Sequence, residues 1–194
     1  MLGIFLDTET NGLDFRKARV LEIAFKIIDL RSHEELLSFD TIIKQPKEVW
    51  DLSDPVSLSI NGFKFEDLAD GLTEDQVFQK ITSKFDELRI CRNKAVFICQ
   101  NPSFDRAFFT QLIPSEEQEE RKWPYHWLDL ASMFWLSYIR ETGHFPMNVG
   151  LSKDKIAHYY KLPPENKPHK ALNGVNHLID CYFALLSSKK QLKT

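Results

Sequence analysis

MLGIFLDTETNGL, residues 1–13, is an apolar run that ends abruptly in acidic and turn-forming residues. An apolar run of this length, bounded by turn formers, predicts a buried strand. Side chains alternate along a strand, so Asp7 and Glu9 are expected on one side of it and Thr8 on the other. The stretch therefore places two carboxylates together at the end of a core strand.

These two carboxylates are unfavourable neighbours. Alternate residues of a strand lie about 5 to 7 Å apart, and like charges at that separation repel each other unless a cation or a proton lies between them. Hard divalent cations such as Mg²⁺ and Mn²⁺ bind sets of carboxylate oxygens of this kind. Taken alone, Asp7 and Glu9 are more simply explained as a strand-ending residue and a solvated turn residue. The metal-site interpretation depends on the rest of the chain.

The composition indicates a single domain over residues 1–194. The chain is 43% hydrophobic and 12% aromatic, which supplies a sizeable core. No apolar stretch approaches the ~20 residues that a membrane span requires, and the N-terminus lacks the basic segment and cleavage site of a signal peptide. We therefore expect a cytoplasmic protein with no membrane partner. Its cysteines, Cys91, Cys99 and Cys181, are expected to be reduced thiols.

The charge balance restricts how the chain can bind a polyanion. The formal net charge is −3 and the sequence pI is about 6.1, so the chain lacks the basic excess of proteins that coat nucleic acid nonspecifically. Any affinity for a polyanion must be local. This favours an enzyme that holds a chain end through metal ions and a few side chains.

The remaining pattern predicts strands that alternate with helices. Apolar, β-branched stretches predict strands over residues 19–29, 36–44, 94–99 and 127–130. Helical spacing and capping residues predict helices over residues 73–89, 103–113, 131–141, 151–160 and 169–187. The short connection between the second and third strands makes them an antiparallel hairpin. We therefore expect an α/β domain with a mixed five-stranded sheet flanked by helices.

Two further polar segments lie at predicted strand and helix ends. Asn101 follows the strand at residues 94–99, and Asp105 lies in the first turn of the next helix. Sites of α/β sheets gather at strand ends, so these residues are expected to face the same crevice as Asp7. His169 begins the last helical segment, and histidine is the usual base for hydrolysis near neutral pH. Taken alone, Asp105 would only complement the helix dipole, and His169 would be an ordinary surface or core residue.

Together these segments resemble a known family. FLDTETNGL (residues 5–13), NPSFDRAFF (101–109) and PHKAL (168–172) occur in this order, and they resemble the three motifs of the DEDDh family of 3′-5′ exonucleases. SING (59–62) and WLD (127–129) fall where that family has a turn and a strand-end aspartate. The resemblance implies a ribonuclease H-like fold. The family includes proofreading subunits of DNA polymerases, oligoribonuclease and RNA-trimming enzymes.

The resemblance also implies roles for the acidic residues. Asp7 would bridge two divalent ions, Mg²⁺ or Mn²⁺, and Glu9 would bind the ion that holds the nucleophilic water. Asp105 would serve the second ion, and His169 would take the proton of the water. The implied mechanism is two-metal hydrolysis, in which one ion activates water and the other stabilises the leaving 3′ oxygen.

Five residues are expected to contact the substrate. The backbone of Thr10 and Gly12 would meet the terminal nucleotide, and Leu13 and Phe104 would offer apolar or stacking surface to its base. Asn101, at the strand exit, is included with them. Core packing and turn chemistry explain the same residue types equally well.

The third motif departs from the family pattern. The family places an aspartate five residues after the histidine, where it binds the water-activating ion, and this chain has Gly174 there. Asp180 would lie ~9 Å further along an ideal helix and ~120° around it, so it replaces the ligand only if Asn173 delays the start of the helix. His177 is better placed on a continuous helix. The sequence leaves Asp180, His177, Asn173 and water as alternatives.

The leading hypothesis is a metal-dependent 3′-5′ exonuclease that releases nucleoside monophosphates from single-stranded DNA or RNA. A second hypothesis is a module of the same fold that binds nucleic-acid ends and has lost full catalysis through Gly174. A third is a proofreading subunit that works beside a DNA polymerase. The sequence does not distinguish DNA from RNA, and it does not indicate an oligomeric state.

Overall fold

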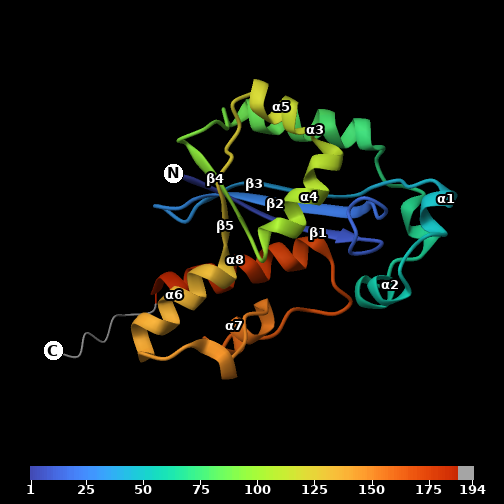
Figure 1. Cartoon of the computed structure of the whole chain (residues 1–194). Helices are drawn as coiled ribbons and strands as arrows, with labels where there is room; N and C mark the ends of the chain where they lie inside the picture. Colours follow the sequence, from blue (N-terminus) through green and yellow to red (C-terminus); the bar gives the residue numbers. More distant parts are fainter. Residues whose placement is uncertain (188–194) are drawn as a thin grey trace.

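The computed structural model describes residues 1–187. They contain a five-stranded mixed sheet with the strand order β3-β2-β1-β4-β5 (Figure 1). β1 pairs antiparallel with β2 and parallel with β4, while β2 and β3 form an antiparallel hairpin and β4 and β5 pair in parallel. The strands are β1 (Leu2–Thr10), β2 (Val20–Asp29), β3 (Glu35–Ile42), β4 (Ala95–Cys99) and β5 (Trp127–Asp129).

Helices cover both faces of this sheet. In Figure 1, α3, α4 and α5 lie on one side of the sheet and α6, α7 and α8 on the other, while α1 and α2 lie beyond the end of β1. None of the helices within residues 1–187 combines the length and the hydropathy needed to cross a bilayer. The helices are α1 (Lys47–Trp50), α2 (Pro55–Asn61), α3 (Glu74–Glu87), α4 (Pro102–Leu112), α5 (Ser115–Glu120), α6 (Leu130–Thr142), α7 (Lys153–Tyr159) and α8 (Ala171–Ser187), with short 3-10 turns at Phe65–Leu68 and Pro146–Asn148.

The alternation along β1 divides the core into two layers. Ile4 and Leu6 belong to the apolar cluster that includes residues of α3 and α4. Phe5 belongs to the cluster on the α8 side, where its ring meets that of Tyr182 at 5.2 Å. Because side chains alternate along a strand, Asp7 continues the face of Phe5. Thr8 contacts Asp105 of α4 on the other face. The structure therefore confirms that Asp7 and Thr8 point to opposite faces of β1.

The first turn of α8 is fixed to the sheet. The backbone N–H of Ala171 donates a hydrogen bond of 2.8 Å to the carboxylate of Glu22 on β2. Burial raises the pKa of Glu22, and the hydrogen bond from Ala171 opposes that rise. α8 runs without a break from Ala171 to Ser187. The delayed helix considered for Asn173 is therefore absent, because the helix has already begun two residues before it.

Most of the predicted elements are present with small shifts of their ends. The capping box expected at the start of α3 forms between Thr73 and Gln76, and the antiparallel hairpin of β2 and β3 is as predicted. The acidic run at residues 116–120 lies in α5.

The parallel part of the sheet gives a test of the core. Phe97 on β4 is fully buried and stacks on Trp127 with ring centroids 4.0 Å apart. Phe97→Ala is expected to lower the free energy of unfolding by about 3 to 5 kcal/mol, because it leaves a cavity between the sheet and α4. Urea denaturation measures the change. Leu136→Ala, at a side chain on α6 that is 59% exposed, is the control, with an expected change within about 0.5 kcal/mol. Equal effects of the two substitutions would contradict this assignment of the core.

Candidate active site

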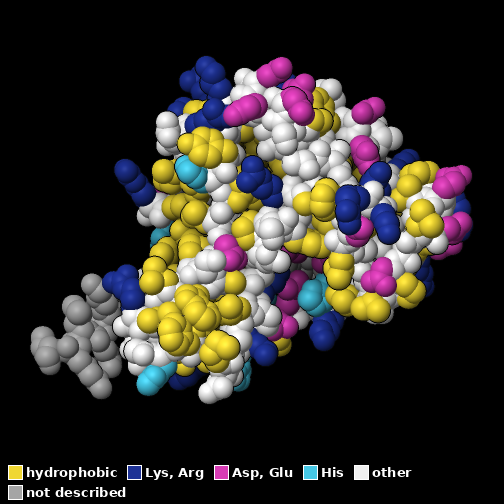
Figure 2. All heavy atoms as spheres, viewed as in Figure 1, with side chains coloured by type: hydrophobic (Ala, Val, Ile, Leu, Met, Phe, Trp, Pro, Cys, Tyr) yellow, Lys and Arg dark blue, Asp and Glu magenta, His cyan; other side chains and the backbone are white. Residues whose placement is uncertain are grey.

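The predicted catalytic residues lie in one pocket at the carboxyl ends of β1 and β4. The pocket has a volume of about 300 Å³. In Figure 2, acidic and histidine side chains lie together in a hollow between α7 and α2. The lining residues are Asp7, Thr8, Glu9, Gln100, Phe104, Asp105, Ser152, Lys153, Asp154, Glu165 and His169.

The three acidic side chains approach this pocket from two faces of the sheet. Asp7 and Glu9 end β1, whereas Asp105 lies in the first turn of α4 on the opposite face. Thr8, which points toward α4, donates a hydrogen bond of 2.8 Å from its hydroxyl to Oδ1 of Asp105. The end of β1 therefore separates Asp105 from the other two carboxylates and also holds it in place.

Burial makes these carboxylates hard to ionise. It raises the pKa of Glu9 to about 8, and the charges of Asp7 and Glu22 add to the rise. Burial also raises the pKa of Asp7, against the lowering effect of Lys153. Burial and the charge of Asp7 raise the pKa of Asp105 well above its ordinary value. A cation near these groups would favour their charged forms.

Lys153 brings a positive charge to Asp7. Its ammonium lies 3.5 Å from Oδ1 of Asp7, 2.9 Å from Oε2 of Glu165 and 3.2 Å from the carbonyl oxygen of Gly174. Only 11% of the Lys153 side chain is exposed. Burial alone would lower the pKa of Lys153, but the charges of Asp7 and Glu165 raise it above its ordinary value. The lysine is therefore charged in the folded chain.

Glu165 connects the lysine to the predicted base. Its Oε1 lies 3.6 Å from Nδ1 of His169, while its Oε2 pairs with Lys153. Burial acts to raise the pKa of Glu165, but the neighbouring His177 and Lys153 lower it to about 2. Glu165 is therefore an ionised, buried carboxylate whose Oε2 faces Lys153 and His177 and whose Oε1 faces His169.

Gly174 leaves no room for a side chain. It is buried against β1, and a Cβ atom built on it would overlap Oδ2 of Asp7 and lie 3.1 Å from the ammonium of Lys153. The space in which the resemblance expects an aspartate is therefore filled by Asp7 and Lys153.

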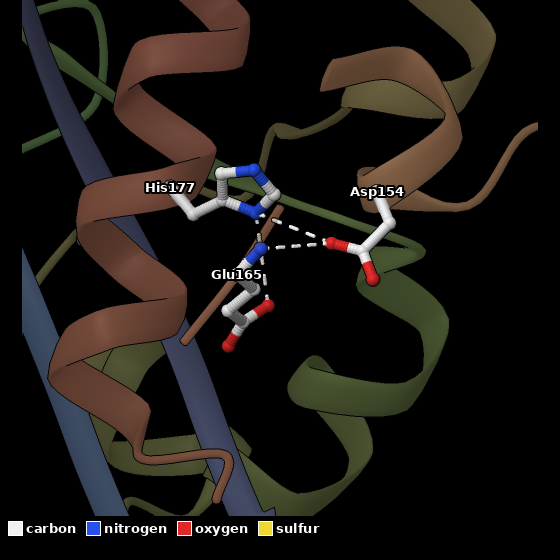
Figure 3. A group of neighbouring side chains, drawn as sticks. All are labelled: Asp154, Glu165 and His177. Atoms are coloured by element: carbon white, nitrogen blue, oxygen red, sulfur yellow. Dashed lines mark hydrogen bonds and ion pairs between the residues drawn. The ribbon is translucent and has the colours of Figure 1, made fainter. Parts of the chain in front are cut away.

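A second polar cluster adjoins the pocket. Figure 3 shows Asp154 of α7, His177 of α8 and Glu165, which lies between these two helices in the sequence, pointing toward one another. Nδ1 of His177 lies 3.8 Å from Glu165 and 3.9 Å from Asp154, while its Nε2 lies 3.0 Å from the carbonyl oxygen of Pro163. Within residues 1–187, this is the one group of three acidic, histidine or cysteine residues whose ligand atoms all lie within 4.8 Å of one another.

The residues of the pocket fit one divalent cation better than the two that the resemblance implies. Asp7, Glu9 and Asp105 supply carboxylate oxygens, the ligands that Mg²⁺ and Mn²⁺ prefer, and burial raises the pKa of each of the three groups. On the other side of Asp7, position 174 offers no carboxylate, and a cation there would meet the ammonium of Lys153. The second ion therefore lacks both a ligand and space.

Of the predicted substrate-contacting residues, Phe104 lines the pocket and the others lie outside its lining. The hydroxyl of Thr10 donates to the carbonyl oxygen of Gly12 at 2.8 Å, which stabilises the turn after β1. Leu13 is 76% exposed. Asn101 begins α4 with a positive φ of 56°. Their contacts with substrate stay predictions.

The three side chains considered as replacements for the missing ligand lie outside the pocket lining. Asp180 is exposed on the continuous helix α8 and does not line the pocket, so the structure does not bring it together with the other predicted ligands. Asn173 also lies outside the pocket lining. His177 is directed toward Glu165 and Asp154 instead of Asp7.

Lys153 and Glu165 line the pocket but were not predicted from the sequence. Lys153 lies in the first turn of α7, and Glu165 lies four residues before His169 in the loop that precedes α8. The alternatives for the missing ligand all follow the histidine in the sequence, whereas Glu165 precedes it. The spacing of Glu165 and His169 was the available signal.

The family comparison agrees with the motifs. The family model described as exonuclease, RNase_T, matches residues 4–180. No curated protein sequence matches the chain.

Solved structures with the same fold are also exonucleases or nucleases. Cell-death related nuclease 4 (CRN-4) is 15% identical with a TM-score of 0.73, over 95% of this chain and 63% of that one. E. coli exonuclease I in complex with a dT13 oligonucleotide is 16% identical with a TM-score of 0.75, over 98% of this chain and 41% of that one. A 3′-exonuclease described with the 3′-end recognition of a histone mRNA stem-loop is 12% identical with a TM-score of 0.71, over 96% of this chain and 64% of that one. The likeness confirms the ribonuclease H-like fold, and the chain spans less than two thirds of each of these proteins.

The packing of Gly174 against Asp7 gives a first test. A helix-interior glycine replaced by alanine ordinarily stabilises a protein by about 0.5 to 1 kcal/mol. Gly174→Ala is expected instead to destabilise it by about 1 to 3 kcal/mol, since its methyl group overlaps Oδ2 of Asp7. Urea denaturation measures both this variant and the control Asn176→Ala, at an exposed position of α8. In an Asp7→Ala background the loss should disappear, and a loss that persists there would contradict the contact.

The raised pKa of Glu9 predicts a pH dependence of stability without divalent cations. Its pKa is about 8 in the folded chain and near 4.5 when unperturbed, so the unfolded state loses its proton first as the pH rises. The free energy of unfolding is therefore expected to fall between these pH values, at about 1.4 kcal/mol per unit at most, and to level off above pH 8. Thermal or urea unfolding at several pH values measures the slope.

Glu9→Gln should flatten this part of the profile, because the amide does not titrate. Glu66→Gln, at an exposed carboxylate, should keep the slope of the unmodified chain. Parallel profiles for Glu9→Gln and the unmodified chain would show that Glu9 does not cause the dependence.

Proposed function

Since the chain belongs to the exonuclease family, as the DEDDh resemblance predicted, we propose that it hydrolyses phosphodiester bonds at the 3′ end of single-stranded DNA or RNA and releases nucleoside monophosphates. The observation that carries the proposal is that Asp7, Glu9, Asp105 and His169, which come from three distant motifs, line one pocket. One similar structure holds a DNA oligonucleotide and another concerns an RNA. The proposal therefore covers both nucleic acids.

The proposed site uses the carboxylates to hold a divalent cation, Mg²⁺ or Mn²⁺. Asp7 and Asp105, with Glu9 beside them, would hold it, and the cation would offset the charge that develops on the phosphate and the leaving 3′ oxygen. Thr8 keeps Asp105 in position through its hydroxyl. Phe104, half-buried in the pocket wall, offers a ring on which a terminal base can stack.

His169 is the proposed general base. Its imidazole lines the pocket, and the carboxylate of Glu165 lies 3.6 Å from its Nδ1. A carboxylate beside one ring nitrogen favours a proton on that nitrogen and leaves Nε2 to accept a proton from water. Glu165 is therefore a positioning residue that acts through His169.

A nuclease assay with three variants tests this function. Incubation of the chain with a 5′-labelled single-stranded oligonucleotide and Mn²⁺ or Mg²⁺ should shorten it one nucleotide at a time from the 3′ end, and EDTA should stop the reaction. Asp7→Asn should abolish it, and His169→Gln should lower kcat by about 10²- to 10⁴-fold, the usual contribution of a general base. His158→Gln, at an exposed histidine of α7, is the control and should retain the rate. No shortening with either metal would overturn the proposed activity.

A second candidate function is binding of nucleic-acid ends with weakened catalysis. Lys153 beside Asp7 and the glycine at position 174 favour it, because they leave the family site without one acidic ligand. Under this function, the chain would bind a 3′ single-stranded end in fluorescence anisotropy but would not shorten it. Activity of the isolated chain would make a DNA polymerase partner unnecessary. A cytoplasmic location also stays a prediction.

A further inference from the structure

We propose that the ammonium of Lys153 is a permanent cation of this site, which takes the place of one of the two divalent ions, so that the free protein binds a single divalent ion at its catalytic carboxylates. The inference rests on the proposed function for the identity of the site. It concerns the number of bound ions and can be tested without substrate.

The contacts of Lys153 are those of a bound cation. Its ammonium has three oxygen atoms within 3.5 Å, one from Asp7, one from Glu165 and one from the backbone of Gly174. An ammonium has three N–H donors, so each donor has an acceptor. A buried charge is stable only with such partners. With 11% of its side chain exposed, Lys153 is a fixed part of the site.

The ammonium of Lys153 occupies the place that a second divalent ion would need. The ammonium lies beside both Asp7 and position 174, where the resemblance expects the acidic ligand of the water-activating ion. Glycine at 174 leaves space that Oδ2 of Asp7 and the ammonium fill together. A divalent ion placed there would lose one ligand and meet a like charge at contact distance.

The elements around Lys153 hold it there. Glu165 pairs with it at 2.9 Å, and the backbone N–H of Glu165 donates a hydrogen bond of 3.0 Å to Asp154. Nδ1 of His177 of α8 lies 3.8 Å from the same Oε2 of Glu165, and its Nε2 lies 3.0 Å from the carbonyl oxygen of Pro163. The cluster of Figure 3 therefore fixes the counter-ion of Lys153. An ion bound within that cluster would compete with the lysine for Glu165.

The remaining carboxylates leave one place for a divalent ion. Asp105 lies in the first turn of α4, on the face of the sheet opposite to Asp7, and Glu9 follows Asp7 on the same strand. The ammonium carries one positive charge, whereas a divalent ion carries two. The repulsion among the three carboxylates is therefore only partly neutralised by Lys153. Deprotonation of water near Lys153 then depends on His169 more than it would beside a divalent ion.

Counting bound Mn²⁺ on the purified chain tests the proposal. Isothermal titration and electron paramagnetic resonance of free Mn²⁺ should give one ion per chain, and Asp105→Asn should lose it. Lys153→Met removes the ammonium from among the oxygens of Asp7, Glu165 and Gly174 and should bind one ion more than the unmodified chain. Lys155→Met removes an exposed lysine of the same helix and should leave the count at one. His177→Gln should also leave it at one, which separates the catalytic carboxylates from the cluster of Figure 3.

Two ions on the unmodified chain, or an unchanged count in folded Lys153→Met, would overturn the proposal. If Lys153→Met does not fold, the count on the unmodified chain decides alone. No ion on the unmodified chain would overturn both the inference and the metal dependence of the proposed function. An absence of nuclease activity with a count of one would overturn the function and leave the inference standing.

Discussion

Repulsion between buried carboxylates is the constraint on which the rest of the site depends. β1 carries Asp7 and Glu9 out of the core, and α4 brings Asp105 to the same strand end from the opposite face. Burial and mutual repulsion raise the pKa values of these groups. The protein itself neutralises part of this negative charge, because α7 places the ammonium of Lys153 beside Asp7. Helix α8 can pack close to β1 only because residue 174 has no side chain.

The sequence predicted the parts of the molecule that depend on local patterns. The alternation along residues 1–9 was sufficient to place Asp7 and Phe5 on one face, since side-chain direction in a strand follows from backbone geometry. The capping box of Thr73 follows from a spacing of three residues. The convergence of strand ends in an α/β sheet was sufficient to place Asp105 with Asp7, whereas the family resemblance was needed to place His169 in the same pocket.

The parts that the sequence did not predict depend on contacts between distant segments. Lys153 and Asp7 are 146 residues apart, and no periodicity links a lysine in a helix to a strand-end aspartate. Glu165 lies in a loop, where neither helical nor strand spacing gives its direction. Gly174 was interpreted as a lost ligand, whereas its packing shows that the same substitution makes room for a neighbouring charge. Asp180 was considered because it is close in sequence, but the helix directs it to solvent.

The attachment of α8 has a consequence for how a substrate is received. The backbone N–H of His169 donates to the carbonyl oxygen of Ile60 at 3.2 Å, and two residues later Ala171 donates to Glu22. The imidazole therefore sits on a short segment that is tethered to α2 at one end and to the sheet at the other. Such a segment cannot swing toward a substrate without breaking a hydrogen bond to a separate element. The backbone that carries the imidazole is therefore fixed in place before any substrate binds.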